Sequence, residues 1–240
     1  MLSRNEVKYI QSLCHKKQRQ LEGLFIAEGP KIAEELLNSD FSIKKIYALP
    51  EWIEKNAINN IEIETIDEID LSRITSLQTP NQVLIIAAQK NDFGKPVLKN
   101  KLTIVLDGIQ DPGNMGTIIR IADWFGIEQI ICSDDTVELY NPKVIQSTMG
   151  SFVRTKVYYS NLKDFLETVD VTVFGAMMKG KNIYELQKSK EGLLVIGNEG
   201  KGIRNDILEC ITNPITIPKK GGAESLNAAV AAGIILSHLV

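Results

Sequence analysis

Apolar and polar positions follow two kinds of pattern along the first ninety residues of the chain. Apolar residues recur at helical spacing over residues 5–13 and 30–37, which predicts two amphipathic helices. Short apolar runs predict three strands, over residues 44–49, 61–66 and 83–88. We therefore expect this part of the chain to form a small α/β unit.

The stretch at residues 89–96 is polar and contains glycine and proline. Such a composition is typical of a linker, and we expect it to run to about residue 100. The chain is thus predicted to divide into a first domain over residues 1–98 and a second over residues 99–240. With 240 residues in all, each domain is long enough to bury a core of its own.

Strand-like and helix-like patterns alternate throughout the second domain. The predicted strands cover residues 102–109, 129–133, 156–159, 171–177, 193–197 and 215–218. One predicted helix ends at residue 125, and others begin at residues 142, 162, 203 and 226. This alternation is typical of an α/β fold with a mostly parallel sheet and helices on both faces. Because such sheets bind ligands beyond the carboxyl ends of their strands, we look for function in the loops that follow strands.

Composition narrows the possible functions. With 44% hydrophobic and 24% charged residues, the chain is globular rather than disordered or collagenous. Its three cysteines lie far apart and it has only two histidines, so we expect no metal site and no histidine-based catalytic triad. The longest charge-free apolar run near an end, residues 228–237, is about half the roughly 20 residues that a membrane helix needs. The cysteine usage and this short run favour a reducing, cytoplasmic setting without a membrane.

Positive charge gathers at the start of the chain, although the net charge of the whole sequence is −3. Residues 1–20 hold five basic side chains and one acidic side chain, a net charge of 5 − 1 = +4. The basic residues are Arg4, Lys8, Lys16, Lys17 and Arg19. This cluster could contact phosphate groups, and it fits the solvated face of an amphipathic helix equally well.

The first unusual loop follows the predicted strand at residues 102–109. Gly113 and Asn114 suit a tight turn and an N-cap, which explains them without a ligand. Arg120 stands among apolar residues, where a cation is costly unless it is paired. It can pair with Asp123, three residues on, or it can hold a phosphate or hydroxyl group near the preceding turn.

The second unusual loop, residues 197–202, has the sequence Gly-Asn-Glu-Gly-Lys-Gly after an apolar strand. Its glycines allow backbone N–H groups to converge on a ligand. The spacing matches neither a Walker loop nor a dinucleotide-binding fingerprint, which argues against a nucleotide-dependent oxidoreductase. Glu199 in this loop is either merely exposed or orients a bound group.

The third unusual loop follows the last predicted strand and contains Lys219 and Lys220. Ser225 is a good N-cap for the final helix, whereas Asn227 is a polar residue of the first helical turn that nothing structural requires. Small residues at 228, 229, 231, 232 and 233 permit close packing of that helix. It packs either on its own sheet or at a subunit interface.

Taken together, the three loops resemble the three ordered motifs of the SpoU/TrmH family of S-adenosylmethionine-dependent RNA ribose 2′-O-methyltransferases. The motifs are Asn114-x-Gly116-x-x-x-Arg120, Gly197-Asn198-Glu199-Gly200, and the stretch from Pro218 through Ser225-Leu226-Asn227-Ala228. This resemblance covers about residues 100–240. Residues 8–29 and 79–83 are also similar, more weakly, to the substrate-binding domain of the ribosomal-RNA branch of the family.

The resemblance implies a fold, a cofactor and roles for particular residues. The catalytic domain would contain a trefoil knot, and the family acts as a homodimer through its last helix. Residues matching the positions around S-adenosylmethionine are Ala176, Gly197, Gly202, Ile217 and Leu226. Arg120 matches the catalytic arginine, and the polar residues around it are Asn114, Glu199, Ser225 and Asn227.

The first domain would then supply affinity for RNA, through contacts of Lys16, Lys17 and Arg19 with the phosphate backbone. The extra domain favours ribosomal RNA as the substrate, by analogy alone. Two alternatives stay open from the sequence. The chain could modify transfer RNA, or it could be a non-catalytic RNA-binding assembly factor that has kept the fold.

Overall fold

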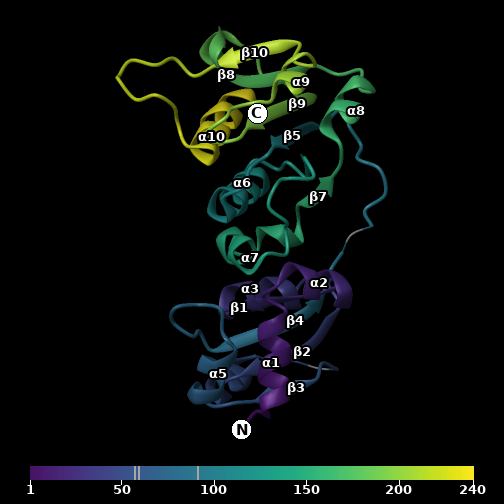
Figure 1. Cartoon of the computed structure of the whole chain (residues 1–240), viewed down its shortest axis with the longest axis vertical. Helices are drawn as coiled ribbons and strands as arrows, with labels where there is room; N and C mark the ends of the chain where they lie inside the picture. The colour runs from purple at the N-terminus through teal and green to yellow at the C-terminus, as the bar shows by residue number, and fades with distance from the viewer. Residues whose placement is uncertain (57, 59, 91) are drawn as a thin grey trace. The chain divides into compact units, whose positions relative to one another are not determined.

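The computed structural model describes residues 1–56, 58, 60–90 and 92–240 (Figure 1). The chain forms two compact units. The first comprises Met1–Asp92 together with Glu138–Val153, and the second comprises Phe93–Val137 together with Arg154–Val240. One residue of the predicted linker, Asn91, lies outside the described residues.

The first unit contains a four-stranded sheet in the order β1-β4-β2-β3. The strands are β1 (Leu24–Glu28), β2 (Ile43–Ala48), β3 (Ile63–Thr65) and β4 (Val83–Ala88). β4 runs antiparallel to both β1 and β2, whereas β3 is parallel to β2. Its helices within residues 1–92 are α1 (Arg4–Ser12), α2 (Lys16–Glu22), α3 (Pro30–Leu37), α4 (Pro50–Lys55) and α5 (Glu68–Ile74). The predicted small α/β unit is therefore confirmed, with more elements than the pattern indicated.

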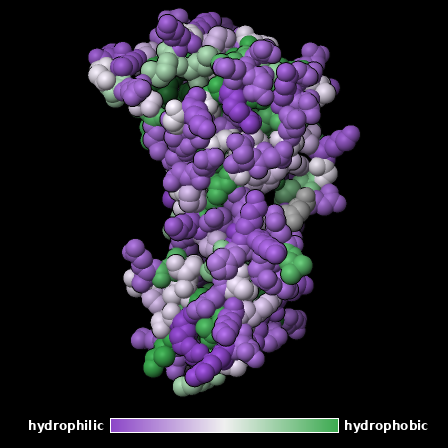
Figure 2. All heavy atoms as spheres, viewed as in Figure 1, coloured by the Kyte–Doolittle hydropathy of each residue, from purple (hydrophilic) through white to green (hydrophobic). Residues whose placement is uncertain are grey.

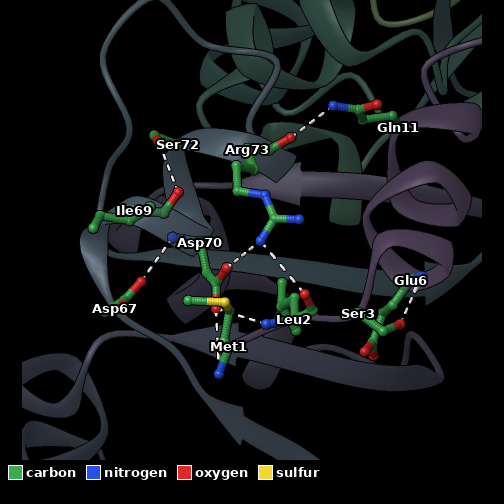
Figure 3. Close-up of polar contacts among 10 residues, drawn as sticks. All are labelled: Met1, Leu2, Ser3, Glu6, Gln11, Asp67, Ile69, Asp70, Ser72 and Arg73. Atoms are coloured by element: carbon green, nitrogen blue, oxygen red, sulfur yellow. Dashed lines mark hydrogen bonds and ion pairs between the residues drawn. The ribbon is translucent and has the colours of Figure 1, made fainter.

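A buried carboxylate joins the first residues of the chain to α5 (Figure 3). Asp70 accepts the backbone N–H of Leu2 at 2.7 Å and forms an ion pair with Arg73 at 2.7 Å. Burial tends to raise the pKa of Asp70, but the hydrogen bonds from Leu2 and Arg73 outweigh it and lower the pKa below its usual value. These contacts hold α1 and α5 together over the apolar core of the unit, which includes Ile10 and Leu71.

A segment that lies between two strands of the second unit packs into the first unit. It contains α7 (Pro142–Thr148) and the short 3-10 helix η1 (Ser151–Val153). The ring of Phe25 lies 4.7 Å from that of Tyr140 and 5.8 Å from that of Phe152, between ring centroids. Tyr140 also exchanges hydrogen bonds with the backbone of Lys90. The pattern of apolar residues could not predict that residues 138–153 belong to the first unit, because this placement depends on contacts between distant segments.

The second unit is built on a six-stranded sheet in the order β10-β8-β9-β5-β6-β7, and all its pairings are parallel. Its strands are β5 (Leu102–Asp107), β6 (Gln129–Cys132), β7 (Lys156–Tyr159), β8 (Val173–Asn182), β9 (Gly192–Gly197) and β10 (Asn213–Thr216). All six residues of β5 are buried, which requires cover on both faces of the sheet. The predicted α/β class with a parallel sheet is thus confirmed.

Helices provide this cover (Figure 1). They are α6 (Pro112–Trp124), α8 (Leu162–Glu167), α9 (Asn205–Leu208) and α10 (Ala228–Leu239), with a 3-10 turn η2 (Ile183–Glu185). Leu162 of α8 and Ile207 of α9 share an apolar cluster with Val105 of β5. α6 and α10 pack against each other and against strands β6 and β9. The implied trefoil knot stays a prediction.

Three helices of the second unit begin at other residues than the pattern indicated. α6 begins at Pro112 after the N-cap Asp111, so Gly113 and Asn114 lie inside the helix instead of forming a turn and cap. α9 begins at Asn205 and α10 at Ala228, each two residues later than predicted.

The face of the molecule seen in Figure 2 is mostly hydrophilic, with apolar side chains scattered over it. No helix in the described part of the chain is long and apolar enough to cross a membrane.

Candidate active site at the carboxyl edge of the parallel sheet

Three predicted site residues from three separate loops form one chain of hydrogen bonds. Asn227 donates from Nδ2 to Oδ1 of Asn114 at 2.8 Å, and Asn114 donates from Nδ2 to Oε1 of Glu199 at 2.7 Å. These residues lie 85 and 113 positions apart in the sequence. The structure therefore brings Asn114, Glu199 and Asn227 together, as the resemblance implied.

The position of Asn114 follows from the way α6 begins. The Asp111 side chain accepts the Asn114 backbone N–H at 2.8 Å, and Pro112 occupies the first turn, where its missing N–H costs nothing. Met115 and Ile118 are fully buried and fix the helix on the sheet. The half-buried Asn114 side chain is thereby presented from the first turn of a firmly packed helix.

Asn227, and not Ser225, is the N-cap of α10, which corrects the sequence prediction. Its Oδ1 accepts the backbone N–H groups of Ala229 at 3.0 Å and Val230 at 3.2 Å. The cap leaves its Nδ2 to bind Asn114, so one side chain both begins the helix and joins the polar chain. Ser225 is exposed, and it has no hydrogen bond to any described residue, so the structure does not bring it into this chain.

Arg120 lies on α6 with an exposed side chain and forms no ion pair or hydrogen bond with any residue that the structure describes. The local alternative, a pair with Asp123, does not form. Instead Asp123 binds Arg154, with Nε–Oδ1 and Nη2–Oδ2 distances of 3.0 and 2.9 Å. The guanidinium of Arg120 is therefore available to an anion or hydroxyl group from outside the chain.

The glycine loop after β9 is closed by its own backbone. Asn198 and Gly202 exchange two backbone hydrogen bonds, at 2.9 and 3.1 Å, and Oδ1 of Asn198 accepts the N–H groups of Gly200 and Lys201. A Cβ on Gly197 would lie 2.3 Å from the carbonyl carbon of Gly202, so no other residue fits there. Gly202 has a φ of +71°, which also favours glycine.

Three residues predicted to bind the cofactor come from neighbouring strands: Gly197 and Ile217 lie at the carboxyl ends of β9 and β10, and Ala176 lies within β8. Ala176 follows the last residue of β8 that pairs with β9, Gly197 ends β9, and Ile217 follows β10 directly. Ala176 and Ile217 are half-buried, whereas Leu226 is 48% exposed. Because β10, β8 and β9 are adjacent in the sheet, these residues border a single edge, where open α/β sheets bind ligands.

The predicted RNA contacts divide into two that are accessible and one that is not. Lys16 and Lys17 are exposed on α2. Arg19 is buried, forms an ion pair with Glu138 and donates to the carbonyl oxygen of Leu13 at 2.8 Å. The predicted role of Arg19 in binding RNA is therefore wrong, because its charge is already used inside the first unit.

Two polar residues near the site were missed by sequence reasoning. Asp107 ends β5, is 1% exposed and accepts the backbone N–H of Arg204 at 2.8 Å. An acidic residue at the carboxyl end of an otherwise apolar buried strand is a signal that could have found it. Arg204, in contrast, lies in a polar stretch without any distinctive pattern. Among the described residues, no group of three or more His, Cys, Asp or Glu residues could hold a metal ion.

Comparisons with known proteins cover the full length of the chain. The chain is 32% identical over 239 residues to the 23S rRNA (guanosine(2553)-2′-O)-methyltransferase RlmP of Bacillus subtilis, covering 98% of this chain and 95% of that protein. Its structure matches a TrmH-family protein from Porphyromonas gingivalis with a TM-score of 0.90 and 34% identity, over 100% of this chain and 98% of that one. It also matches an AdoMet-bound rRNA methyltransferase from Sinorhizobium meliloti, with a TM-score of 0.87, 29% identity and coverage of 100% and 96%.

The fold, the site and these matches define the class of protein as an S-adenosylmethionine-dependent RNA methyltransferase, which confirms the class predicted from the three motifs. More particularly, the chain belongs to the SpoU rRNA methylase family, whose model matches residues 101–237. The MRM3-like substrate binding domain matches residues 4–85.

Proposed function

We propose that this chain transfers the methyl group of S-adenosylmethionine to a ribose 2′-hydroxyl of ribosomal RNA. The observation that carries the proposal is the hydrogen-bonded chain Asn227–Asn114–Glu199. Its central residue, Asn114, lies on the same helix as the unpaired guanidinium of Arg120. The similarity to RlmP over nearly the whole chain, N-terminal unit included, favours ribosomal over transfer RNA.

Methyl transfer to a ribose hydroxyl requires in-line positioning and removal of the hydroxyl proton. The sulfonium of the cofactor supplies the methyl group and the leaving group. An arginine side chain is a poor base, because a guanidinium stays protonated at neutral pH. We therefore assign Arg120 to binding the phosphate next to the reacting ribose and favouring ionisation of its 2′-hydroxyl, whose proton passes to water. Asn114, Glu199 and Asn227 order the site around it, and exposed Ser225 lies two residues before Asn227 in the chain.

The residues at the carboxyl edge fit the cofactor. The glycine loop presents backbone groups where β9 ends, and half-buried Ala176 and Ile217 add apolar surface from the neighbouring strands. Leu226 and Gly202 complete the set that would hold the adenosine and methionine parts. All of them lie in the second unit, and Gly197 and Ile217 lie at strand ends, where such ligands bind.

The decisive experiment incubates the purified chain with methyl-labelled S-adenosylmethionine and separate pools of ribosomal and transfer RNA, then maps the label to ribose positions. We expect 2′-O label in ribosomal RNA. Label in transfer RNA alone would keep the chemistry and overturn the substrate. Cofactor binding without label in any RNA, including immature ribosomal RNA, would favour the non-catalytic assembly factor.

We assign RNA binding outside the catalytic site to the first unit, which contains most of the predicted domain of residues 1–98. Replacing both Lys16 and Lys17 with glutamine should weaken RNA binding uniformly across sequences, because these exposed side chains contact phosphate. The slope of log K against log salt should become less steep by about 1.5 for the two lost contacts. Filter binding over a salt series measures this slope. Replacing exposed Lys188 and Lys190 with glutamine matches the charge change, and an equal loss in that control would refute the assignment.

Point variants are a better test than deletion of the first domain. The rings of Tyr140 and Phe152 are covered by Phe25 and its neighbours within the first unit. Removing residues 1–98 would expose these rings and leave Glu138 without Arg19. A loss of activity after deletion would therefore report on folding as well as on RNA binding.

We also propose that the chain acts as a homodimer through α10 in the cytoplasm. Ala229 and Ala232 are buried within the chain, so part of the small-residue stripe packs internally, but Val230 stays 50% exposed. Light scattering should give twice the chain mass of 26.7 kDa, and a Val230→Asp variant should shift it toward the monomer. A wild-type monomer would overturn the dimer. The cysteines Cys14, Cys132 and Cys210 are free thiols, which fits a reducing compartment.

A further inference from the structure

Glu199 lies at an exposed position on a loop that is itself exposed at residues 199–202. Its hydrogen bond with Asn114 is also exposed, so water competes with each partner and weakens the net contribution of the bond. Such a contact cannot by itself hold a loop in one place. The position of Glu199 must therefore be set by stronger contacts at the ends of the loop.

The two ends of the loop are held by two adjacent residues, Asp107, which ends β5, and Gly108, which follows it. At its start, Asn198 donates from Nδ2 to the carbonyl oxygen of Gly108 at 2.7 Å. At its end, Arg204 donates its backbone N–H to Oδ2 of Asp107 at 2.8 Å, and its Nε forms an ion pair with Oδ1 at 2.7 Å. The loop is thus held at both ends by adjacent residues where one buried strand ends.

The contact between Arg204 and the buried Asp107 fixes the position of the end of the loop. The Asp107 side chain is fully buried, and a buried carboxylate is strongly unfavourable unless it is paired and hydrogen-bonded. Gly108 is fixed in turn by a hydrogen bond from its N–H to Oγ of Ser133, at 2.8 Å, and by a φ of +71°. Asp135 also approaches Arg204, at 3.7 Å, but it is 50% exposed and accepts no hydrogen bond from it.

We infer that Asp107 is a positioning residue for the reaction: it holds the end of loop 198–204 and thereby places Glu199 against Asn114. This inference rests on the proposed function for its kinetic consequence only. The structural consequence, a loop that is ordered by Asp107, is independent of which RNA is methylated.

The first test compares Asp107→Asn with Asp135→Asn, which removes the other carboxylate near Arg204. Hydrogen exchange followed by mass spectrometry should show faster exchange over residues 198–204 in Asp107→Asn, and no change in Asp135→Asn. The thermal midpoint of each variant reports whether it is folded. If Asp107→Asn does not fold, Arg204→Gln and Arg204→Lys replace it, and lysine should restore part of the protection because it keeps the charge. Unchanged exchange in the loop of folded Asp107→Asn, or of Arg204→Gln, would overturn the inference.

The second test measures whether the effects of Asp107 and Glu199 on kcat depend on each other. Asp107→Asn should lower kcat by at least about 10-fold, since a misplacement of about 1 Å can cost 100-fold. In a Glu199→Ala background, the same change should cost less than about 3-fold, because alanine has no oxygen to accept the hydrogen bond from Asn114 and the contact is already lost. A merely structural role gives equal losses in both backgrounds, and that result would contradict the inference. Absence of methyl transfer by the wild-type chain would instead refute the proposed function, while the exchange experiment would still decide the role of Asp107.

Discussion

Replacing Arg120 with alanine should lower the rate of methyl transfer by about 10²- to 10³-fold, the usual cost of removing one preorganised electrostatic group from an active site. The side chain is exposed and bound to no described residue, so its removal leaves no partner unpaired. We therefore expect an unchanged thermal midpoint and an affinity for S-adenosylmethionine within a few-fold of wild type. Single-turnover kinetics with ribosomal RNA, together with calorimetric titration of the cofactor, measures both quantities.

Two further variants act as controls: one separates the charge of Arg120 from its shape, and the other removes a different exposed arginine. Arg120→Lys keeps the charge but loses the planar fork that binds two phosphate oxygens, so its rate should fall well below wild type. Arg154→Ala removes another exposed arginine of the second unit, one that pairs with Asp123, and should stay within about 2-fold of the wild-type rate. Nearly full turnover by Arg120→Lys would contradict bidentate binding of phosphate.

Local sequence patterns predicted the exact bounds of three elements. The strands at residues 83–88 and 156–159 and the helix at residues 30–37 have the predicted bounds. β4 has five buried residues in a row, and α3 has the helical spacing and an N-terminal proline that mark a surface helix. The helix α2 was missed because its sequence, KKQRQLE, is polar on nearly every side.

The capping residues show where local patterns are insufficient. Ser225 and Asn227 are both good N-cap residues, and the sequence alone does not decide between them. The choice depends on where α10 can begin while Asn227 still reaches Asn114, a residue from another loop. The same holds for Arg19, whose burial depends on Glu138 far along the chain. Residues whose roles depend on distant partners could be listed as candidates from the sequence, but not assigned.

The sequence predicted the residues of the candidate site better than the residues that hold them in place. The three motifs supplied Asn114, Glu199 and Asn227, which the structure joins by hydrogen bonds. Asp107 and Arg204, which hold the loop, lie outside the side chains that those motifs single out. A motif marks residues that face the ligand, whereas the residues that orient them are recognisable only once the strand ends are brought together.

Replacing Gly197 with alanine should disrupt the glycine loop more than any other single methyl group added to it. The new Cβ would lie 2.3 Å from both the carbonyl carbon of Gly202 and the backbone nitrogen of Ile203, and 2.6 Å from the carbonyl oxygen of Gly202. These are backbone atoms, so no side chain can move aside to relieve the contact. The backbone pair between Asn198 and Gly202 must separate instead. We expect the free energy of unfolding to fall by about 1–3 kcal/mol, the usual cost of overpacking.

The same displacement should weaken the binding of S-adenosylmethionine by at least about 10-fold, because the proposed pocket uses the backbone of this loop. Gly200→Ala is the matched control, since its Cβ would meet only Oδ1 of Asn198, at 3.7 Å. That variant should stay within about 0.5 kcal/mol of the wild-type stability. Urea denaturation and calorimetric titration of both variants measure the two effects. If Gly197→Ala binds the cofactor as tightly as Gly200→Ala does, the backbone of this loop does not form the pocket, and the assignment of Gly197 to the cofactor fails.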